Sequence, residues 1–318
     1  VTDNVEGIVP EFLGLLKGVI DSPDIPLNVS RSYLQSDASV KKITNYITRK
    51  VADKLNSIFK NERENLESKW NDIKVVIEYG MLTEDKFYDK AESFNLYPTV
   101  DDKYFTYEEL EKKIKKLQTD KDGNLIILYA QNKDEQYTYI ESAKEKGYEV
   151  LLLDSPIIPH LMQKLESKKE KIKFSRVDSD TLENLIKKDE EVISKLTDEE
   201  KEKLKPMIET AVENEKYTVQ LEALDSNSMP FMLAQPEFMR RMKEMQQTGG
   251  GAMGNLPDMY SLIVNTNHEL VDKILNTRTE KKRSSLIKQS IDLAILSQNN
   301  LTGKDLTEFI NRSIDLIK

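Results

Sequence analysis

The sequence has no cysteine, only two histidines and no long apolar run, and each absence removes a class of function. Without cysteine the 318-residue chain forms neither disulfides nor thiolate metal sites. This fits a reducing compartment, and we expect a cytoplasmic protein. His160 and His268 are far apart in sequence, so we expect no metal site. The longest apolar runs, such as Leu125–Tyr129, are far below the roughly 20 residues that span a bilayer, so we expect no membrane partner.

Charge and length narrow the possibilities further. Charged residues make up 32% of the chain and the formal net charge is −9, without the cluster of Lys and Arg that a phosphate backbone requires. We therefore expect no nucleic-acid partner. The length suggests about two domains. The chain begins on Val1 and shows no signal-peptide pattern, and we expect it to be part of a longer protein.

The first domain is predicted to mix helices and strands. Apolar residues recur every three or four positions from Val40 to Ile58, which predicts an amphipathic helix. A second helical block covers 62–80 and contains Trp70, the only tryptophan, which is most simply a core anchor. The strand-length apolar runs 125–130 and 149–153 flank a helical segment, which predicts a parallel βαβ unit. Segment 171–177 adds one more possible strand.

Two capping boxes mark helix starts. Thr106 with Glu109 opens a Lys- and Glu-rich helix, and Thr197 with Glu200 opens another that runs to about Asn214. The charged stretch 187–195 before the second box is our predicted domain boundary. We expect an α/β (α+β) fold, with a first domain at 1–190, whose second α/β part covers about 98–190, and a smaller mixed α/β domain at 191–318 that ends in a helix pair.

A methionine-rich segment lies in the second domain. Seven of the ten methionines fall between Met229 and Met259, beside several glycines that predict a flexible loop. Flexible apolar side chains of this kind repack against partners of many shapes, although a core helix is the simpler interpretation. The candidate contact residues are Met229, Phe231, Met232, Phe238, Met239, Met242 and Met245, with Trp70 as an additional candidate.

The chain ends in two predicted helices with wide apolar stripes. Two short helices cannot bury both stripes on one another, so they either dock on their own domain or form a four-helix bundle with a second copy. The first stripe contains Leu286, Ile287, Ile291 and Ile295, and the second contains Leu306, Phe309, Ile310, Ile314 and Ile317.

The segment from Ile8 to Gln35 carries a resemblance to a known family. It reads IVPEFLGLLKGVIDSPDIPLNVSRSYLQ and closely resembles a signature of the 90-kDa heat-shock protein chaperones. Weaker similarity continues to the segment before His268, where Thr266 stands at a position that is usually proline in the family. The resemblance identifies 1–190 with the middle domain and 191–318 with the C-terminal dimerisation domain. From the resemblance we expect that the family's N-terminal ATP-binding domain is not part of this sequence, and without the acidic EEVD tail of eukaryotic members we expect the bacterial form.

The resemblance implies functions for particular residues. Ser30 is placed to cap the helix after it, which puts Arg31 in the first turn and Gln35 on the same face. Spacing alone makes a structural role for such an arginine the commoner case. The family match implies that Arg31, with Gln35 and Asn28, completes the ATPase site of the missing domain by reaching the γ-phosphate.

The resemblance thus predicts the client-binding and dimerising portion of an ATP-dependent stress-response chaperone that assists protein folding. The expected partners are a second copy of the chain, non-native client proteins and the N-terminal ATPase domain. ATP with Mg is expected only in the full-length protein, and this part alone is not expected to be an enzyme. The alternative is a non-catalytic dimeric scaffold. A separate α/β enzyme is disfavoured, because the turn after the strand at 125–130 contains no glycine to cradle a phosphate.

Overall fold

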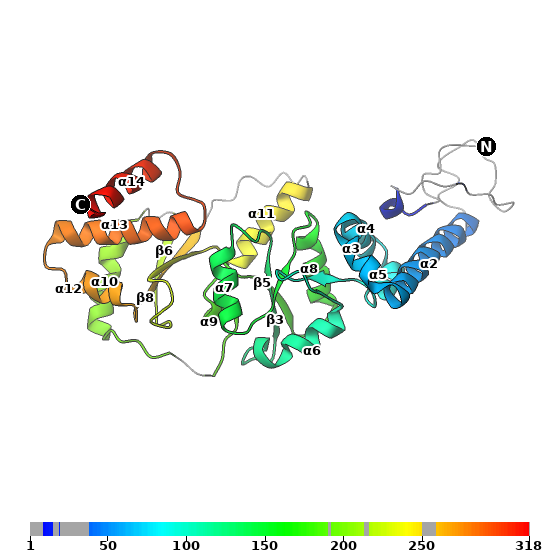
Figure 1. Ribbon diagram of the computed structural model, residues 1–318, viewed down its shortest axis with the longest axis horizontal. Coiled ribbons are helices and arrows are strands. Elements are labelled where there is room, and N and C mark those ends of the chain that lie inside the picture. The colour runs from blue at the N-terminus through cyan, green and yellow to red at the C-terminus, as the bar shows by residue number, and fades with distance from the viewer. Residues whose placement is uncertain are drawn as a thin grey trace. The chain divides into compact units, whose positions relative to one another are not determined.

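A computed structural model describes residues 9–14, 19, 38–189, 192–212, 216–249 and 259–317. The chain divides into two compact units (Figure 1). The first comprises Val1–Lys115 and Leu151–Glu170, and the second comprises Lys116–Val150 and Lys171–Lys318. The mixed α and β architecture confirms the expected fold class. The predicted domain boundary at 190/191 falls outside the described residues and stays a prediction.

The first unit is mainly helical. Its elements are η1 (Glu11–Leu13), α2 (Ala38–Asn61), α3 (Arg63–Ser68), α4 (Trp70–Thr83), α5 (Asp85–Ala91), β1 (Tyr97–Pro98), β2 (Tyr104–Phe105), most of α6 (Tyr107–Gln118), and α8 (Ile158–Lys168). The two short strands pair antiparallel. The amphipathic helix predicted from Val40 to Ile58 is confirmed as α2.

Aromatic side chains fill the core of this unit. Trp70 and Phe87 are buried, which confirms the core interpretation of the single tryptophan. The rings of Phe12 and Phe87 lie 4.6 Å apart. Gly80 permits this packing, because a Cβ at that position would lie 2.7 Å from the Phe12 ring. The short helix η1 therefore sits directly on α4.

The first predicted capping box is confirmed. The Thr106 N–H donates to the Glu109 carboxylate at 2.9 Å, and the Glu109 N–H donates to the Thr106 hydroxyl at 3.3 Å. Arg63 of α3 also binds both carboxylate oxygens of Glu109, at 2.6 and 2.9 Å. These hydrogen bonds from Arg63 lower the pKa of Glu109 to about 2. The box thus also joins α3 to the start of α6.

The second unit contains two sheets and the helices that cover them. Its elements are β3 (Leu125–Ala130), α7 (Tyr137–Glu145), β5 (Ile172–Arg176), α9 (Leu182–Leu185), α10 (Asp198–Glu209), β6 (Tyr217–Glu222), β7 (Phe231–Ala234), α11 (Glu237–Gly249), β8 (Tyr260–Asn265), α12 (Glu269–Asn276), α13 (Glu280–Ser297) and α14 (Gly303–Ile317). The strand β4 (Val150–Leu152) crosses the division between the units.

Among the strands that the structure describes, β3 is the most buried. All six of its residues are buried, and it pairs in parallel with β5, with Leu125 opposite Ile172 and Tyr129 opposite Arg176. A continuous apolar run is what a strand covered on both faces requires. The predicted helix stop after α7 is confirmed, because Gly147 has a φ of +74°.

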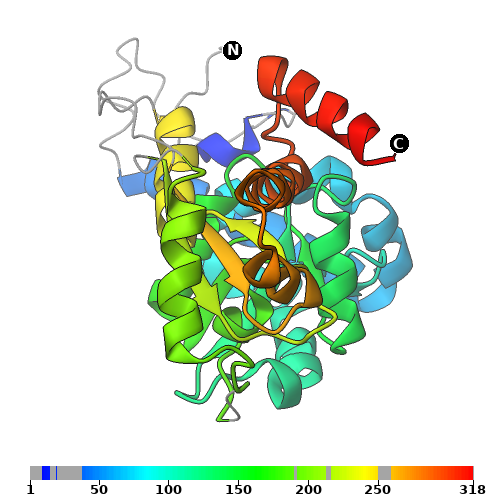
Figure 2. The same cartoon turned by 90° about the vertical axis from the view of Figure 1, so that its left-hand side faces the viewer.

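The second sheet has the order β6-β8-β7, with β6 parallel and β7 antiparallel to β8. Alternation along the strands divides the sheet into two faces. Leu262 and Val264 of β8 face the main core, to which α10, α12 and α13 contribute, whereas Ile263 faces a small cluster with Leu224 and Ala234. Figure 2 shows α13 nearly end-on against this sheet. The second capping box, Thr197 with Glu200, is confirmed at the start of α10.

Within the described part of the chain, no helix combines the length and the hydropathy that crossing a membrane requires.

A buried carboxyl group lies in the first unit. Glu78 of α4 is 7% exposed, and its Oε2 has no hydrogen-bond partner among the described residues. Burial raises the pKa of Glu78 to about 7, and the nearby ammonium group of Lys74 offsets this only in part. The folded state therefore holds the Glu78 proton to a higher pH than the unfolded chain does.

This predicts a pH-dependent stability that Glu78→Gln removes. Between pH 4.5 and about 7 the folded state binds more protons than the unfolded state, so the free energy of unfolding falls as pH rises through that window. A rise in pKa from 4.5 to about 7 corresponds to about 3 kcal/mol in total. We expect Glu78→Gln to be more stable than the wild type above pH 7 and to lack this fall in stability. Urea unfolding at pH 5, 6, 7 and 8, followed by the fluorescence of Trp70, measures both.

The control is Glu64→Gln at an exposed position, which should keep the wild-type pH profile. Parallel profiles for the wild type and Glu78→Gln would contradict the assignment.

Candidate functional site

The helix α11 carries two stripes of opposite character. Its charged residues Glu237, Arg240, Arg241 and Glu244 follow the i, i+3, i+4, i+7 spacing of one helix face. Its apolar residues lie on the remaining surface. The helix begins directly after Pro236, whose carbonyl accepts the N–H of Arg240.

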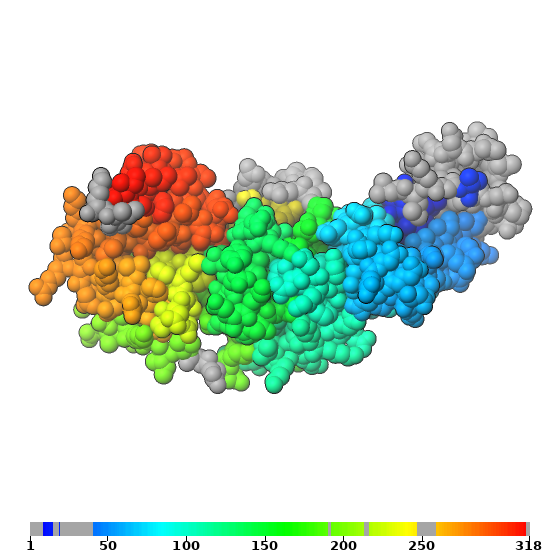
Figure 3. Space-filling view, viewed as in Figure 1, coloured from blue at the N-terminus to red at the C-terminus, as the bar shows by residue number. Residues whose placement is uncertain are grey.

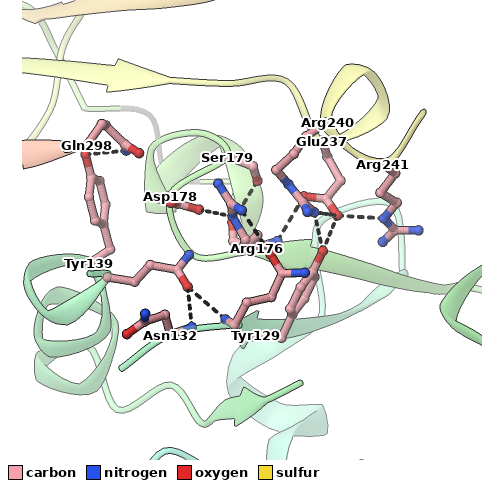
Figure 4. A network of polar contacts seen from close by, with 12 residues as sticks. Tyr129, Asn132, Tyr139, Arg176, Asp178, Ser179, Glu237, Arg240, Arg241 and Gln298 are labelled. Carbon is pink, nitrogen blue, oxygen red and sulfur yellow. Dashed lines mark hydrogen bonds and ion pairs between the residues drawn. The ribbon is translucent and has the colours of Figure 1, made fainter. Parts of the chain in front are cut away.

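The charged stripe is the one that contacts the rest of the second unit (Figure 4). The Glu237 carboxylate accepts hydrogen bonds from the Tyr129 hydroxyl of β3 at 2.8 Å and from the backbone N–H of Arg176 at the end of β5 at 3.1 Å. It also accepts from the guanidinium groups of Arg240 and Arg241, each at 2.6 Å. One carboxylate thus binds donors from two strands and from its own helix.

Arg240 is buried at this point, with an exposed fraction of 3%. Its guanidinium donates to the Tyr129 hydroxyl and to the carboxylates of Glu237 and Glu244. Arg241 donates to the carbonyl oxygen of Phe174 in β5. We call this set the docking cluster; it consists of Tyr129, Arg176, Glu237, Arg240, Arg241 and Glu244.

Burial and neighbouring charges shift the pKa values of Glu237 and Tyr129 in the docking cluster. Burial alone would raise the pKa of Glu237, but the guanidinium groups of Arg240 and Arg241 hold it below its ordinary value. Burial and the neighbouring Glu237 carboxylate raise the pKa of Tyr129, so its hydroxyl stays protonated and able to donate. The lowered pKa of Glu237 and the raised pKa of Tyr129 thus favour a carboxylate beside a neutral phenol.

The apolar stripe of α11 lies away from this contact. Phe238 is 71% exposed, and Met239, Met242 and Met245 are half-buried. A surface helix of a globular protein usually docks by its apolar face. Here the orientation is reversed, and a flexible apolar surface remains accessible for a partner.

The other candidates of the methionine-rich segment do not share this helix. Phe231 and Met232 lie on β7, and Met229 lies in the turn before it. Phe231 is 2% exposed in the main core of the second sheet, so its assignment as a contact residue is corrected. The structure provides the reason: β7 alternates, and Phe231 shares a face with Leu233.

Met229 and Met232 instead line a cleft of about 380 Å³. Tyr139 and Leu224 also line this cleft, together with several acidic side chains. The remaining candidate, Trp70, is 1% exposed, so it has no surface to offer a partner and is also removed from the contact residues. The contact candidates that stay accessible are Met229, Met232, Phe238, Met239, Met242 and Met245.

The terminal helices divide their apolar residues between two environments. Ile287, Ile291 and Ile295 of α13 are buried in the main core against their own sheet. Their assignment to a dimer interface is corrected, because α13 uses these side chains to cover one face of the sheet in its own domain. Leu286, Leu306 and Phe309 are half-buried and pack against the same core.

The outer surfaces of these two helices keep exposed apolar residues. On α14, Ile310 and Ile314 are each 47% exposed, and on α13 Leu293 and Leu296 are 49% and 36% exposed. Figure 3 shows α14 (red) packed on the outer side of α13 (orange). Arg312 joins α14 to Asp292 of α13 by an ion pair. The sequence pattern predicted Ile310 and Ile314 but missed Leu293 and Leu296, and the side chain of Ile317 lies outside the described residues.

The predicted catalytic residues Arg31, Gln35 and Asn28 all lie outside the described residues. Within the described ranges, no group of three or more His, Asp or Glu side chains is arranged to hold a metal ion. His268 has a structural role, since its Nδ1 accepts the N–H of Leu270 at 3.0 Å at the start of α12.

The members of the docking cluster were not among the candidates from sequence. The available signal was the charged stripe at i, i+3, i+4 and i+7, but it predicts only a helix face, and exposure to solvent is the simplest explanation of such a face. Tyr129 lies within an apolar run, and its partner Glu237 is far away in the sequence.

Comparison with known proteins identifies the family. The family described as "Hsp90 protein" matches residues 1–315. The "Chaperone protein HtpG" of Bacteroides thetaiotaomicron is 44% identical over 386 aligned residues, which cover 100% of this chain and 57% of that protein. The protein of the same name from Porphyromonas gingivalis is 48% identical over 301 residues, which cover 93% of this chain and 44% of that protein. The chain spans about half the length of these curated relatives, and it belongs to the Hsp90 protein family.

Proposed function

We propose that the chain is the client-binding and dimerising portion of an ATP-dependent molecular chaperone. The observation that carries the proposal is the outward apolar stripe of α11 in a chain of the Hsp90 family. Relatives at 44 and 48% identity bear the name chaperone protein HtpG. Non-native proteins expose apolar segments of varied shape, and exposed methionines adapt to such segments without a fixed pocket.

In this proposal Phe238 is the main contact of α11 with a client. Its ring is the most exposed side chain of the apolar stripe, and Met239, Met242 and Met245 extend the surface along the helix. Aromatic side chains dominate the energetics of protein contacts, because they bury a large area with few rotatable bonds. Met229 and Met232, in the neighbouring cleft, provide a further apolar surface.

We expect Phe238→Ser to weaken binding of a non-native protein roughly tenfold, the effect of losing about 1.4 kcal/mol at one contact. The measurement is fluorescence anisotropy with labelled, reduced and carboxymethylated α-lactalbumin, which stays unfolded. The matched control is Tyr137→Ser, which removes an aromatic ring that is 63% exposed on α7. Equal affinities for Phe238→Ser, Tyr137→Ser and the wild type would sink the α11 proposal.

Self-association is proposed through the exposed sides of α13 and α14. A second copy related by two-fold symmetry would bring four helices together and cover Leu293, Leu296, Ile310 and Ile314. Ion pairing between Arg312 and Asp292 fixes α14 on α13, so each copy presents a preformed pair of helices.

We expect the chain to sediment as a dimer at micromolar concentration and Ile310→Asp to sediment as a monomer, because a carboxylate buried without a partner opposes association. Analytical ultracentrifugation measures the dissociation constant, which should rise at least 100-fold. The control is Val75→Asp, at an apolar position of α4 that is 39% exposed. A wild-type monomer, or an unchanged dimer for Ile310→Asp, would refute this interface.

Control by nucleotide is the third part of the proposal. In the full-length protein an N-terminal domain would hold ATP and Mg, and Arg31, with Gln35 and Asn28, would contribute to its ATPase site. Docking of the two domains would then depend on ATP, and hydrolysis would reopen the dimeric clamp around a client.

We expect Arg31→Ala in the full-length protein to lower the steady-state ATPase rate at least 100-fold while the affinity for ATP changes little, the signature of a group that acts on the transition state. Coupled-enzyme turnover and isothermal titration with ATP measure the two quantities, and Lys41→Ala, an exposed cation near the start of α2, is the control. Unchanged turnover would favour the alternative, a dimeric scaffold without a catalytic contribution.

A further inference from the structure

A buried network of charged side chains joins α11 to the parallel sheet. Among the described side chains of this helix, residues 237–246, Arg240 alone is buried. The main core and the small cluster of the second sheet contain no residue of α11. Docking-cluster residues of the helix form hydrogen bonds to both β3 and β5.

Two opposing free-energy contributions determine how stable this contact is. Removing the Arg240 guanidinium from water opposes docking, and attraction to the carboxylates of Glu237 and Glu244 offsets that penalty. The compensation is incomplete, because the Arg240 Nε is buried and has no hydrogen-bond partner among the described residues. A buried network with unsatisfied members gives little net stability while its geometry stays specific.

Glu237 is the centre of the network. Its carboxylate accepts from both strands, through the Tyr129 hydroxyl and the Arg176 backbone N–H. The Tyr129 hydroxyl accepts from Arg240 while it donates to Glu237, so one phenol joins the cation to the anion. Loss of either group leaves the buried guanidinium of Arg240 undercompensated.

We infer that Glu237, Arg240 and Tyr129 are positioning residues: they hold α11 on the ends of β3 and β5 by its charged face, so that the Phe238 stripe faces outward, and loss of one partner releases the helix. The inference rests on the proposed client contact for the meaning of the outward stripe. The docking itself is a separate property of the chain and is measured separately.

Amide hydrogen exchange of the full chain tests the docking. In the wild type we expect the amides of α11 to be protected at low salt and to stay protected in 1 M NaCl, because salt screens buried charge pairs much less than exposed ones. Tyr129→Phe removes one oxygen atom, and Glu237→Gln removes one charge. We expect each variant to exchange at least tenfold faster in α11 than the wild type.

The exchange of β8 distinguishes release of α11 from general unfolding. The backbone of β8 lies at the centre of its sheet, and its amides should stay as slow in Tyr129→Phe and Glu237→Gln as in the wild type. The control variant is Glu108→Gln, which breaks an exposed ion pair with Lys112 and should leave α11 unchanged. If α11 stays protected in Glu237→Gln, or if β8 exchanges faster together with α11, the inference is wrong.

Binding of carboxymethylated α-lactalbumin then tests the positioning role. Glu237→Gln keeps every residue of the apolar stripe, yet we expect its affinity to fall about fivefold, because an ordered helix loses less conformational entropy on binding. Phe238→Ser should lose affinity while the exchange of α11 stays at the wild-type rate. If no variant alters the affinity, the proposed client contact fails, whereas the exchange data still decide whether the docking cluster holds the helix. Unchanged affinity for Glu237→Gln beside a loss for Phe238→Ser would refute the positioning role alone.

Discussion

A guanidinium group that leaves water must be met by carboxylates, and in the second unit this requirement determines the orientation of α11. Arg240 has its partners on the charged stripe of the helix and on the end of β3. Tyr129 is available there because it is the next-to-last residue of β3, the buried central strand of the sheet, and its hydroxyl reaches Glu237. The Arg176 N–H of the adjacent strand completes the set of donors to Glu237. An apolar strand, a phenol and one carboxylate together leave the methionine stripe facing outward.

The terminal helices obey a different constraint. The sheet β6-β8-β7 has a face that water would otherwise reach, and α13 covers it with Ile287, Ile291 and Ile295. Only the apolar residues that remain after this packing are free for a second copy. The two explanations of the stripes, docking on the same domain and dimerisation, are therefore not exclusive: the first applies to the inner side of α13, and the second is proposed for its outer side and for α14.

Much of the secondary structure could be predicted from the sequence, because it depends on local chemistry. The capping boxes at Thr106 and Thr197, the helix stop at Gly147 and the apolar run of β3 each have a short-range cause. Two elements escaped prediction: β7 is only four residues long and lies in a methionine-rich stretch, and α8, with 11 residues, has Pro159 in its first turn. The family could be predicted from one long motif. The docking cluster could not, because Tyr129 and Glu237 meet only after two sheets have formed.

One polar contact gives the terminal helices a mechanical connection to the parallel sheet. Gln298, the residue after α13, donates to the Tyr139 hydroxyl of α7 at 2.7 Å and to the Leu233 carbonyl of β7 at 3.0 Å. At a rise of about 1.5 Å per residue, the 18 residues of α13 form a rod about 27 Å long that is anchored at this end. Ile287, Ile291 and Ile295 hold the same rod on its own sheet, so a displacement of α7 is transmitted to the sheet and to α13 together.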